Sequence, residues 1–159
     1  MNIKFLLLVF ISLLSACATV PEFDTKNVEF SLTPEQVINK PAATRGKTIV
    51  WGGTILDIKN LEKATRLEIL AYPLNDSYRP LTDQKPLGRF IIFHSGYLEP
   101  TTYAQGKQLS VLGKVNGTQS GKVGETRYTY ALIKSQQLHL WSKESETQTF
   151  FHFGIGVQL

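Results

Sequence analysis

The chain has 159 residues, of which 42% are hydrophobic and 19% charged, and its formal net charge at pH 7 is +4. These proportions are ordinary for a globular protein, so they exclude a collagen-like or wholly disordered chain, and the length predicts one domain. The single cysteine excludes an intramolecular disulfide, so the domain must be stabilised by its core.

The amino-terminal segment combines a basic start with an apolar run. Lys4 precedes residues 5–14, in which Ser12 is the only polar residue. As a helix this run would be about 15 Å long, half of the roughly 30 Å of a bilayer core, so it is too short for a transmembrane anchor. With the small residues that follow, it predicts a secretory signal peptide at residues 1–16. A buried amino-terminal helix is the alternative, but the run has no polar face to meet solvent.

The sequence Leu14-Ser15-Ala16-Cys17 resembles the lipobox of bacterial lipoproteins. The resemblance implies cleavage between Ala16 and Cys17, a diacylglyceryl group on the Cys17 thiol and an acylated new amino terminus. Two or more acyl chains hold a protein on a membrane stably, whereas one myristoyl-sized chain does so only marginally. An aspartate after the cysteine would imply the inner membrane; Ala18 stands there, which implies the outer membrane of a Gram-negative host. The alternative is an incidental cysteine in an ordinary signal peptide.

We expect residues 17–46 to contain the lipidated cysteine and an irregular tether that leads into a partly ordered arm. Thr33, Pro34 and Gln36 have the spacing of a helix start, with Thr33 as the N-cap. The helix should end near Asn39, because a proline follows two residues later. The residues expected to dock on the main domain are Phe30, Leu32 and Val37. A loose spacer is the alternative.

From residue 47 onward, short β-branched and aromatic runs alternate with Gly, Pro, Asn and Asp, which is typical of an all-β domain. The first expected strand carries Gly52-Gly53 in its middle, where a strand can bulge or bend sharply. Between the third and fourth strands we expect one short helix at residues 99–106, because proline stands near its start and glycine at its end. The expected strands are residues 48–59, 66–72, 88–95, 108–116 and 126–141.

The order strand, strand, strand, helix, strand, strand, with a long first strand bent at glycine, is that of the OB-fold. We therefore expect residues 47–159 to form a mainly β, OB-fold-like five-stranded barrel. Curling of the first strand at Gly52-Gly53 would let it pair on two sides and remove the edges of an open sheet. A small open sandwich is the alternative.

Seven short stretches follow one another in a fixed order along the mature chain. They are WGGTI (51–55), TRLEI (65–69), YPL (72–74), RP (79–80), GRF (88–90), GYLEP (96–100) and GKVGE (121–125). Together with the lipobox, they resemble the Slp family, the starvation-inducible outer membrane lipoproteins of Gram-negative bacteria. The resemblance implies an outer membrane location and an association with starvation or envelope stress. It implies no enzyme activity and brings no catalytic residues.

The residue types that carry catalysis or bind metals form no recognisable pattern. The histidines are His94, His139 and His152. They lack paired ligand spacing, so no metal site is predicted. Ser95 lacks the flanking glycine of a nucleophile elbow, and Lys122 lacks the glycine spacing of a phosphate loop. We therefore predict no catalytic residue and no cofactor.

An OB-fold could also stack on single-stranded nucleic acid through aromatic and arginine side chains, here Tyr128, Tyr130, Arg66 and Arg89. Little nucleic acid is present at the inner face of an outer membrane, so no nucleic-acid partner is predicted. The modest positive charge instead favours anionic surfaces such as lipid head groups, peptidoglycan or lipopolysaccharide. Another envelope protein is a further candidate partner.

The leading hypothesis is a non-enzymatic lipoprotein, held at the periplasmic face of the outer membrane by acylated Cys17. The alternative is a periplasmic module that binds a glycan or peptide through the barrel groove. Its candidate binding surface is Tyr72, Tyr97 and Tyr128. Tyrosines at this density are also common in the core of a barrel.

Overall fold

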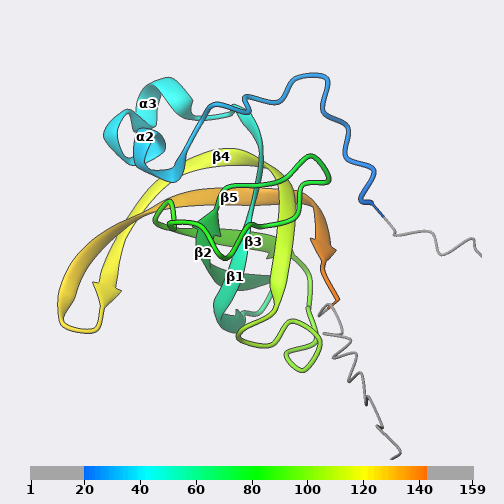
Figure 1. Ribbon diagram of the computed structural model, residues 1–159. Coiled ribbons are helices and arrows are strands. Elements are labelled where there is room, and N and C mark those ends of the chain that lie inside the picture. The colour runs from blue at the N-terminus through cyan, green and yellow to red at the C-terminus, as the bar shows by residue number, and fades with distance from the viewer. Residues whose placement is uncertain (1–19, 143–159) are drawn as a thin grey trace, which may run out of the picture.

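The computed structural model describes residues 20–142 as a five-stranded barrel preceded by two short helices (Figure 1). The elements are α2 (Pro34–Asn39), α3 (Pro41–Thr44), β1 (Thr48–Asn60), β2 (Ala64–Tyr72), β3 (Arg89–Ser95), β4 (Gln108–Val123) and β5 (Thr126–Leu140). Within the described range, no helix is long and apolar enough to cross a bilayer. Ala16, Cys17 and His152 lie outside this range.

The strands close into a barrel in the order β1-β2-β3-β5-β4, and β4 pairs back onto β1. β3 and β5 pair in parallel, whereas the other neighbouring strands are antiparallel. This order confirms the OB-fold-like barrel, and the alternative of an open sandwich is wrong.

β1 pairs on two sides at its glycine pair, as the sequence predicts, and its β-bulge lies further along, between Ile55 and Asp57. Gly52, Gly53 and Thr54 pair with β2 and with β4 at the same time. A Cβ atom at Gly53 would lie 1.9 Å from the carbonyl oxygen of Leu70, and one at Gly52 would lie 2.8 Å from that of Leu109. Only glycine allows both partner strands to approach this closely.

Alternate side chains of the strands fill the barrel. In β2, Leu67 and Ile69 have no exposed surface and Ala71 is 2% exposed, so these three residues form the inner face of this strand. Trp51 and Phe90 meet edge to face, with 5.2 Å between ring centroids. Burial of large apolar side chains stabilises the fold by about 1.5–3 kcal/mol for each side chain.

α2 packs against β4 and β5 and begins where the sequence predicts. The Thr33 hydroxyl accepts a hydrogen bond from the Gln36 N–H at 3.3 Å, and the Gln36 side chain accepts one from the Thr33 N–H at 2.9 Å. This reciprocal pair is a capping box. Val37 is fully buried in the main core and Leu32 packs against that core, so both dock as expected. Phe30, by contrast, is 61% exposed.

The helix expected at residues 99–106 is wrong. The segment between β3 and β4 forms hydrogen-bonded turns, one of which is closed by the Tyr103 N–H donating to the Glu99 carbonyl. The end of the segment is tied to β1, because the Gly106 N–H donates to the Ile55 carbonyl at 2.9 Å. A helix this short gains too little from its own hydrogen bonds to compete with such pairing.

β4 and β5 continue past the barrel as a long hairpin (Figure 1). The expected fourth strand ends at Asn116, whereas β4 pairs with β5 as far as Val123 opposite Thr126. Gly124 takes a φ of +58° in the two-residue turn, a conformation that glycine adopts readily. The hairpin places the tyrosine-rich start of β5 beside α2.

Candidate functional site

Two adjoining cavities lie between α2, the β2–β3 loop (residues 73–88) and the barrel. We name them after one lining residue each: the Tyr128 cavity has a volume of about 590 Å³ and the Tyr78 cavity about 450 Å³. The residues that line both are Thr33, Pro34 and Leu87. The two cavities therefore form one groove along the start of α2, of a size typical of ligand sites.

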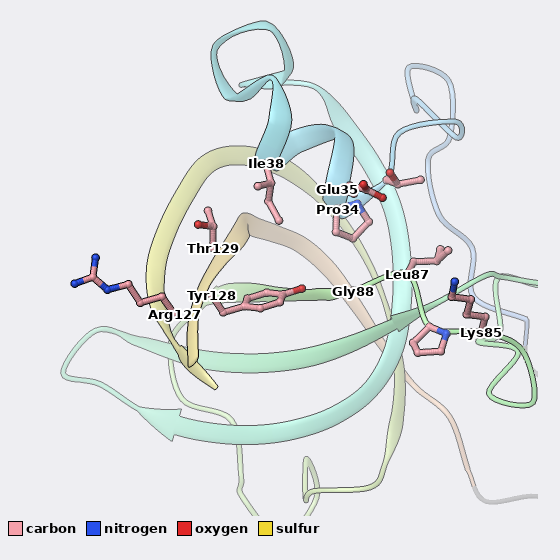
Figure 2. Close-up of a pocket in the computed structure, with 11 residues that line it drawn as sticks. Pro34, Glu35, Ile38, Lys85, Leu87, Gly88, Arg127, Tyr128 and Thr129 are labelled. Carbon is pink, nitrogen blue, oxygen red and sulfur yellow. The ribbon is translucent and has the colours of Figure 1, made fainter. Parts of the chain in front are cut away.

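The Tyr128 ring lies beneath α2 with its hydroxyl pointing toward Gly88 (Figure 2). The hydroxyl accepts a hydrogen bond from the Arg89 N–H at 2.9 Å and can still donate its own proton. Gly88 has a φ of +103°, and a Cβ atom there would lie 3.2 Å from the hydroxyl oxygen. Pro34 and Ile38 of α2 project toward the ring (Figure 2). The cavity thus offers an aromatic face opposite aliphatic side chains.

Charged residues of both signs line the Tyr128 cavity. Glu35 comes from α2, Lys85 from the β2–β3 loop and Arg127 from β5. Arg127 extends away from the Tyr128 ring (Figure 2). This cavity can therefore accept polar ligands of either charge.

A cluster of charged side chains supports the tyrosines of β5. Glu68 Oε1 accepts from Arg89 Nη1 at 2.9 Å and from the Tyr130 hydroxyl at 3.2 Å, and Glu68 Oε2 accepts from Arg66 Nη2 at 3.3 Å. Burial, followed by the nearby Glu68 carboxylate, raises the pKa of Tyr130 above its ordinary value. The rings of Tyr130 and Tyr128 lie 4.8 Å apart between centroids. Both oxygens of Glu68 are therefore engaged in holding this wall of the groove.

Aromatic side chains form the walls of the Tyr78 cavity. The rings of Phe30 in the arm and Tyr78 in the loop are nearly parallel, with 6.5 Å between centroids and 11° between planes. Tyr72 of β2 and Trp51 of β1 also line the cavity. The Trp51 indole N–H donates to the Leu32 carbonyl at 2.8 Å, which ties the arm to the barrel. The arm, the loop and the barrel thus each contribute one wall.

The backbone of Tyr78 has a φ of +64°, which is uncommon for a bulky residue. Its N–H donates to the Asn75 carbonyl at 2.8 Å, and its carbonyl accepts from the Ser110 hydroxyl. Asn75 Oδ1 accepts from the N–H groups of Ser77 and Arg79, at 3.0 Å and 2.9 Å. Strain of this kind persists where surrounding contacts enforce it, and it clusters at functional sites. The loop therefore holds the Tyr78 ring in a fixed position.

The structure divides the three tyrosines of the predicted binding surface. Tyr72 lines the Tyr78 cavity and Tyr128 lines the cavity beside it, so both belong to the groove. Tyr97 does not line either cavity. It follows the end of β3 that lies away from Arg89, it is 66% exposed, and its hydroxyl donates to Glu99 at 3.0 Å.

Sequence reasoning missed Phe30 and Tyr78 as groove residues. They lie far apart along the chain, one in an arm and one in a loop, and only the folded chain brings their rings together. One local signal points to Tyr78, because residues 75–77 are a turn-forming Asn-Asp-Ser sequence and an aromatic residue follows directly.

Residues 20–142 contain no group of three or more His, Cys, Asp or Glu side chains that could hold a metal ion. His94 Nδ1 lies 2.9 Å from the Ser135 hydroxyl oxygen. His139 packs edge-on against Trp141, with 4.4 Å between ring centroids, and desolvation lowers the pKa of His139 below its ordinary value. Each described histidine thus has a packing or hydrogen-bonding partner in the barrel.

Comparison with known protein families decides where the chain belongs. The model of the family described as Outer membrane lipoprotein Slp family matches residues 14–155. The chain belongs to this family. The resemblance predicted from short motifs is therefore confirmed, and so is the outer membrane location.

Among similar proteins, one is named an outer membrane protein and another a lipoprotein. The Uncharacterized lipoprotein YeaY of Escherichia coli (strain K12) is 30% identical over 136 residues, which cover 83% of this chain and 68% of that protein. The Outer membrane protein Slp of the same strain is 26% identical over 154 residues, which cover 91% and 79%. An uncharacterized protein of Haemophilus influenzae is 28% identical over 131 residues, which cover 81% and 70%.

Two solved structures are weakly similar to this Slp-family chain. A small single-stranded DNA-binding protein from Streptomyces coelicolor has a TM-score of 0.38 and 13% identity, and covers 60% of this chain and 94% of its own. Schizosaccharomyces pombe Pot1pC bound to ssDNA has a TM-score of 0.34 and 9% identity, and covers 79% and 91%. TM-scores this low support no conclusion about the ligand of the Slp-family protein.

Several of the stretches that carry the Slp resemblance lie around the groove. Residues 65–69 and 88–90 supply the members of the Glu68 cluster from β2 and β3. Residues 72–74 and 79–80 lie on either side of Tyr78 in the chain. These four stretches thus lie on or beside the groove.

Proposed function

We propose that this Slp-family protein is a non-enzymatic outer membrane lipoprotein, held at the periplasmic face by acyl chains on Cys17 and associated with starvation or envelope stress. The observation that carries the proposal is the lipobox at residues 14–17, directly behind the apolar run and within the family match. The corresponding units are the signal peptide (1–16), the lipidated cysteine and arm (17–46) and the barrel domain (47–159).

The packing of the arm against the barrel supports a short distance between the lipid anchor and the barrel. Phe23 is 7% exposed and packs with Val50 and Leu112 on the outside of β1 and β4. The Gln137 side chain donates to the Glu22 carbonyl at 3.2 Å. When extended, the chain from Cys17 to Phe23 spans at most about 20 Å, so an anchor on Cys17 would keep the barrel beside the bilayer.

The lining of the groove supports a role other than catalysis. Within the described part of the chain, neither cavity is lined by a histidine, cysteine or serine. Glu68, which lies beside Tyr130, already has both oxygens engaged by Arg66 and Arg89. Histidine, the commonest catalytic base, and the common nucleophiles cysteine and serine are therefore absent from the lining of the described groove.

The anchor is tested by labelling growing cells with radioactive palmitate and fractionating their membranes. We expect wild type to carry the label and to sediment with outer membranes. Cys17→Ser should lose the label and leave the membrane fraction, while Ser31→Ala, a change at an exposed residue of the arm, should behave as wild type. Total protein is measured by immunoblot, so that degradation is not mistaken for release. Unchanged sedimentation of Cys17→Ser would show that another segment attaches the protein.

A second candidate function is a binding module for an envelope glycan, favoured by the groove that Tyr72 and Tyr128 line. A peptide is less favoured, because the floor of the groove offers little free backbone. The Leu87 N–H donates to the Ala71 carbonyl, and the Ala71 N–H donates to the Gly88 carbonyl, each at 2.8 Å. An extended peptide would need such groups to pair with. Glycans instead use ring faces and side-chain polar groups, which this groove presents.

The binding role is tested by titrating the full-length lipoprotein, in detergent micelles, with candidate envelope partners. The probes are soluble peptidoglycan fragments, lipopolysaccharide and a mixture of unstructured peptides, and the readout is tryptophan fluorescence, because Trp51 lines the groove. We expect a saturable change with a glycan. A change with peptides alone would contradict the glycan assignment, and no change with any probe would contradict a binding role. Lipid head groups and another envelope protein are further proposed partners; nucleic acid is not proposed.

A further inference from the structure

The charge of the Tyr78 cavity differs from that of its neighbour. Asp76 is its one charged lining residue within the described chain, and no lysine or arginine lines it. The Tyr128 cavity, in contrast, is lined by Lys85 and Arg127 as well as Glu35. An anionic group would be repelled in the Tyr78 cavity, whereas a neutral or cationic group would not.

One aromatic ring of the Tyr78 cavity is largely exposed, whereas Tyr72 and Tyr78 are half-buried and Trp51 is buried. Phe30 lies beside the Tyr78 ring but keeps 61% of its surface exposed. The Tyr78 ring also contacts Phe23, with 5.6 Å between centroids, which supports it from the barrel side. An exposed ring backed by further aromatic rings offers a face on which a ligand can stack.

Polar groups stand at the rim of the same cavity. Backbone N–H groups of the loop donate to Asn75 Oδ1, so the Nδ2 group is the donor that the Asn75 side chain still offers. Within residues 20–142, neither Asn75 Nδ2 nor the Asp76 carboxylate hydrogen-bonds to another protein group. The rim thus combines one amide donor with one carboxylate acceptor.

We propose that the Tyr78 cavity is a subsite for one ring of a neutral or amino-sugar glycan; this inference rests on the proposed glycan-binding role. The C–H face of a sugar ring packs on the exposed Phe30 ring, which the Tyr78 ring supports from the other side. Hydroxyl groups at the edge of the ring donate to Asp76 and accept from Asn75. The ammonium group of an amino sugar gains further from Asp76 and from the aromatic faces. An acidic sugar places its carboxylate beside Asp76 and is disfavoured.

The test uses calorimetric titration of the full-length lipoprotein in nonionic detergent micelles with three hexasaccharides. They are a neutral N-acetylglucosamine hexamer, a cationic glucosamine hexamer and an anionic galacturonic acid hexamer. We expect the first two to bind at least about tenfold more tightly than the third. Phe30→Ala should weaken both by about tenfold, because it removes one stacking face. Asp76→Asn should weaken only the cationic hexamer, by about fivefold.

Two matched variants separate this subsite from the rest of the surface. Lys63→Ala removes an exposed positive charge between β1 and β2, and Tyr97→Ala removes an exposed aromatic residue; neither position lines the groove. Both should bind the neutral hexamer within about twofold of wild type. Thermal unfolding should show that Phe30→Ala folds normally, since this side chain is mostly exposed.

Each negative result of these titrations would contradict a different part of the proposal. Sugar binding that survives Phe30→Ala, or that is lost in Lys63→Ala, would overturn the subsite while glycan binding in the groove stands. Tightest binding of the anionic hexamer would overturn the assigned charge. If no hexamer binds at millimolar concentration, the sugar subsite is wrong, and the fluorescence titration with envelope polymers decides the broader binding role.

Discussion

At the scale of single residues, the Glu68 carboxylate accepts hydrogen bonds from several side chains that support the groove wall. Its side chain is 13% exposed and accepts hydrogen bonds from Arg66, Arg89 and Tyr130. A carboxylate so nearly buried is stable only when its oxygens are paired in this way. The single hydroxyl proton of Tyr130 is shared between two acceptors, because the hydroxyl oxygen also lies 3.2 Å from the Lys122 carbonyl oxygen; this shared contact joins the hairpin to the sheet.

Tyr130→Phe should lower the free energy of unfolding by about 1 kcal/mol, because it removes the hydroxyl that bridges Glu68 and Lys122. Urea denaturation followed by circular dichroism measures the change. The control is Tyr97→Phe, whose hydroxyl bonds only on the exposed surface, and its effect should stay within about 0.5 kcal/mol. Equal effects of the two substitutions would contradict the bridging role of Tyr130.

His139 makes the stability of the barrel depend on pH. Desolvation lowers its pKa in the folded state below the ordinary value of 6.5, so folding favours the neutral ring. The contribution is complete above the unfolded pKa and is lost as the pH falls below it. We expect the urea midpoint of wild type to fall more between pH 7.5 and pH 5.5 than that of His139→Asn. Parallel pH profiles of the two proteins would show that another group is responsible.

At the scale of elements, β1 requires glycine where it pairs with β2 and β4 at the same time. Gly53→Ala should destabilise the barrel by about 3 kcal/mol or more, because the added Cβ would lie 1.9 Å from the Leu70 carbonyl oxygen. Gly46→Ala is the matched control: no atom lies within 4 Å of its Cβ position, but its φ of +81° predicts a loss of about 1 kcal/mol. Both are measured by urea denaturation. A loss at Gly53 no larger than that at Gly46 would contradict the close strand approach.

Most of the strands could be predicted from sequence because apolar alternation marks them. The capping box of α2 was also predictable, since Thr33 and Gln36 act on their own local backbone. The end of β4 was not, because residues 117–123 are mostly polar or glycine and show no apolar period. The turns at residues 99–106 depend on pairing with Ile55, which no local pattern reveals.

Only some of the groove residues could be predicted from the sequence, because the groove is built by segments that lie far apart along the chain. Tyr72 and Tyr128 could be proposed from the sequence because they stand in recognisable strands. Phe30 and Tyr78 could not, because their meeting depends on how the arm and the β2–β3 loop fold onto the barrel. Tyr97 looks equivalent by residue type and neighbouring motif, yet the course of the chain places it away from the groove.

At the scale of the whole molecule, the described chain begins and ends on the same side of the barrel, away from the tip of the β4–β5 hairpin (Figure 1). The Arg79 side chain donates to the Ser142 carbonyl at 3.2 Å, which holds the carboxyl end of the described chain near the β2–β3 loop. If Cys17 is acylated, we expect the hairpin to point away from the bilayer, because the anchor is only three residues before Val20. The barrel would then sit close to lipid while the tip of the hairpin reaches into the periplasm.

Mass spectrometry of the mature protein isolated from its native host shows directly whether Cys17 carries the acyl chains. We predict an amino-terminal peptide that begins at Cys17, with a diacylglyceryl group on the thiol and a third acyl chain on the amine. A mature chain that begins upstream of Cys17, or one that begins there with a free thiol, would contradict attachment through lipid.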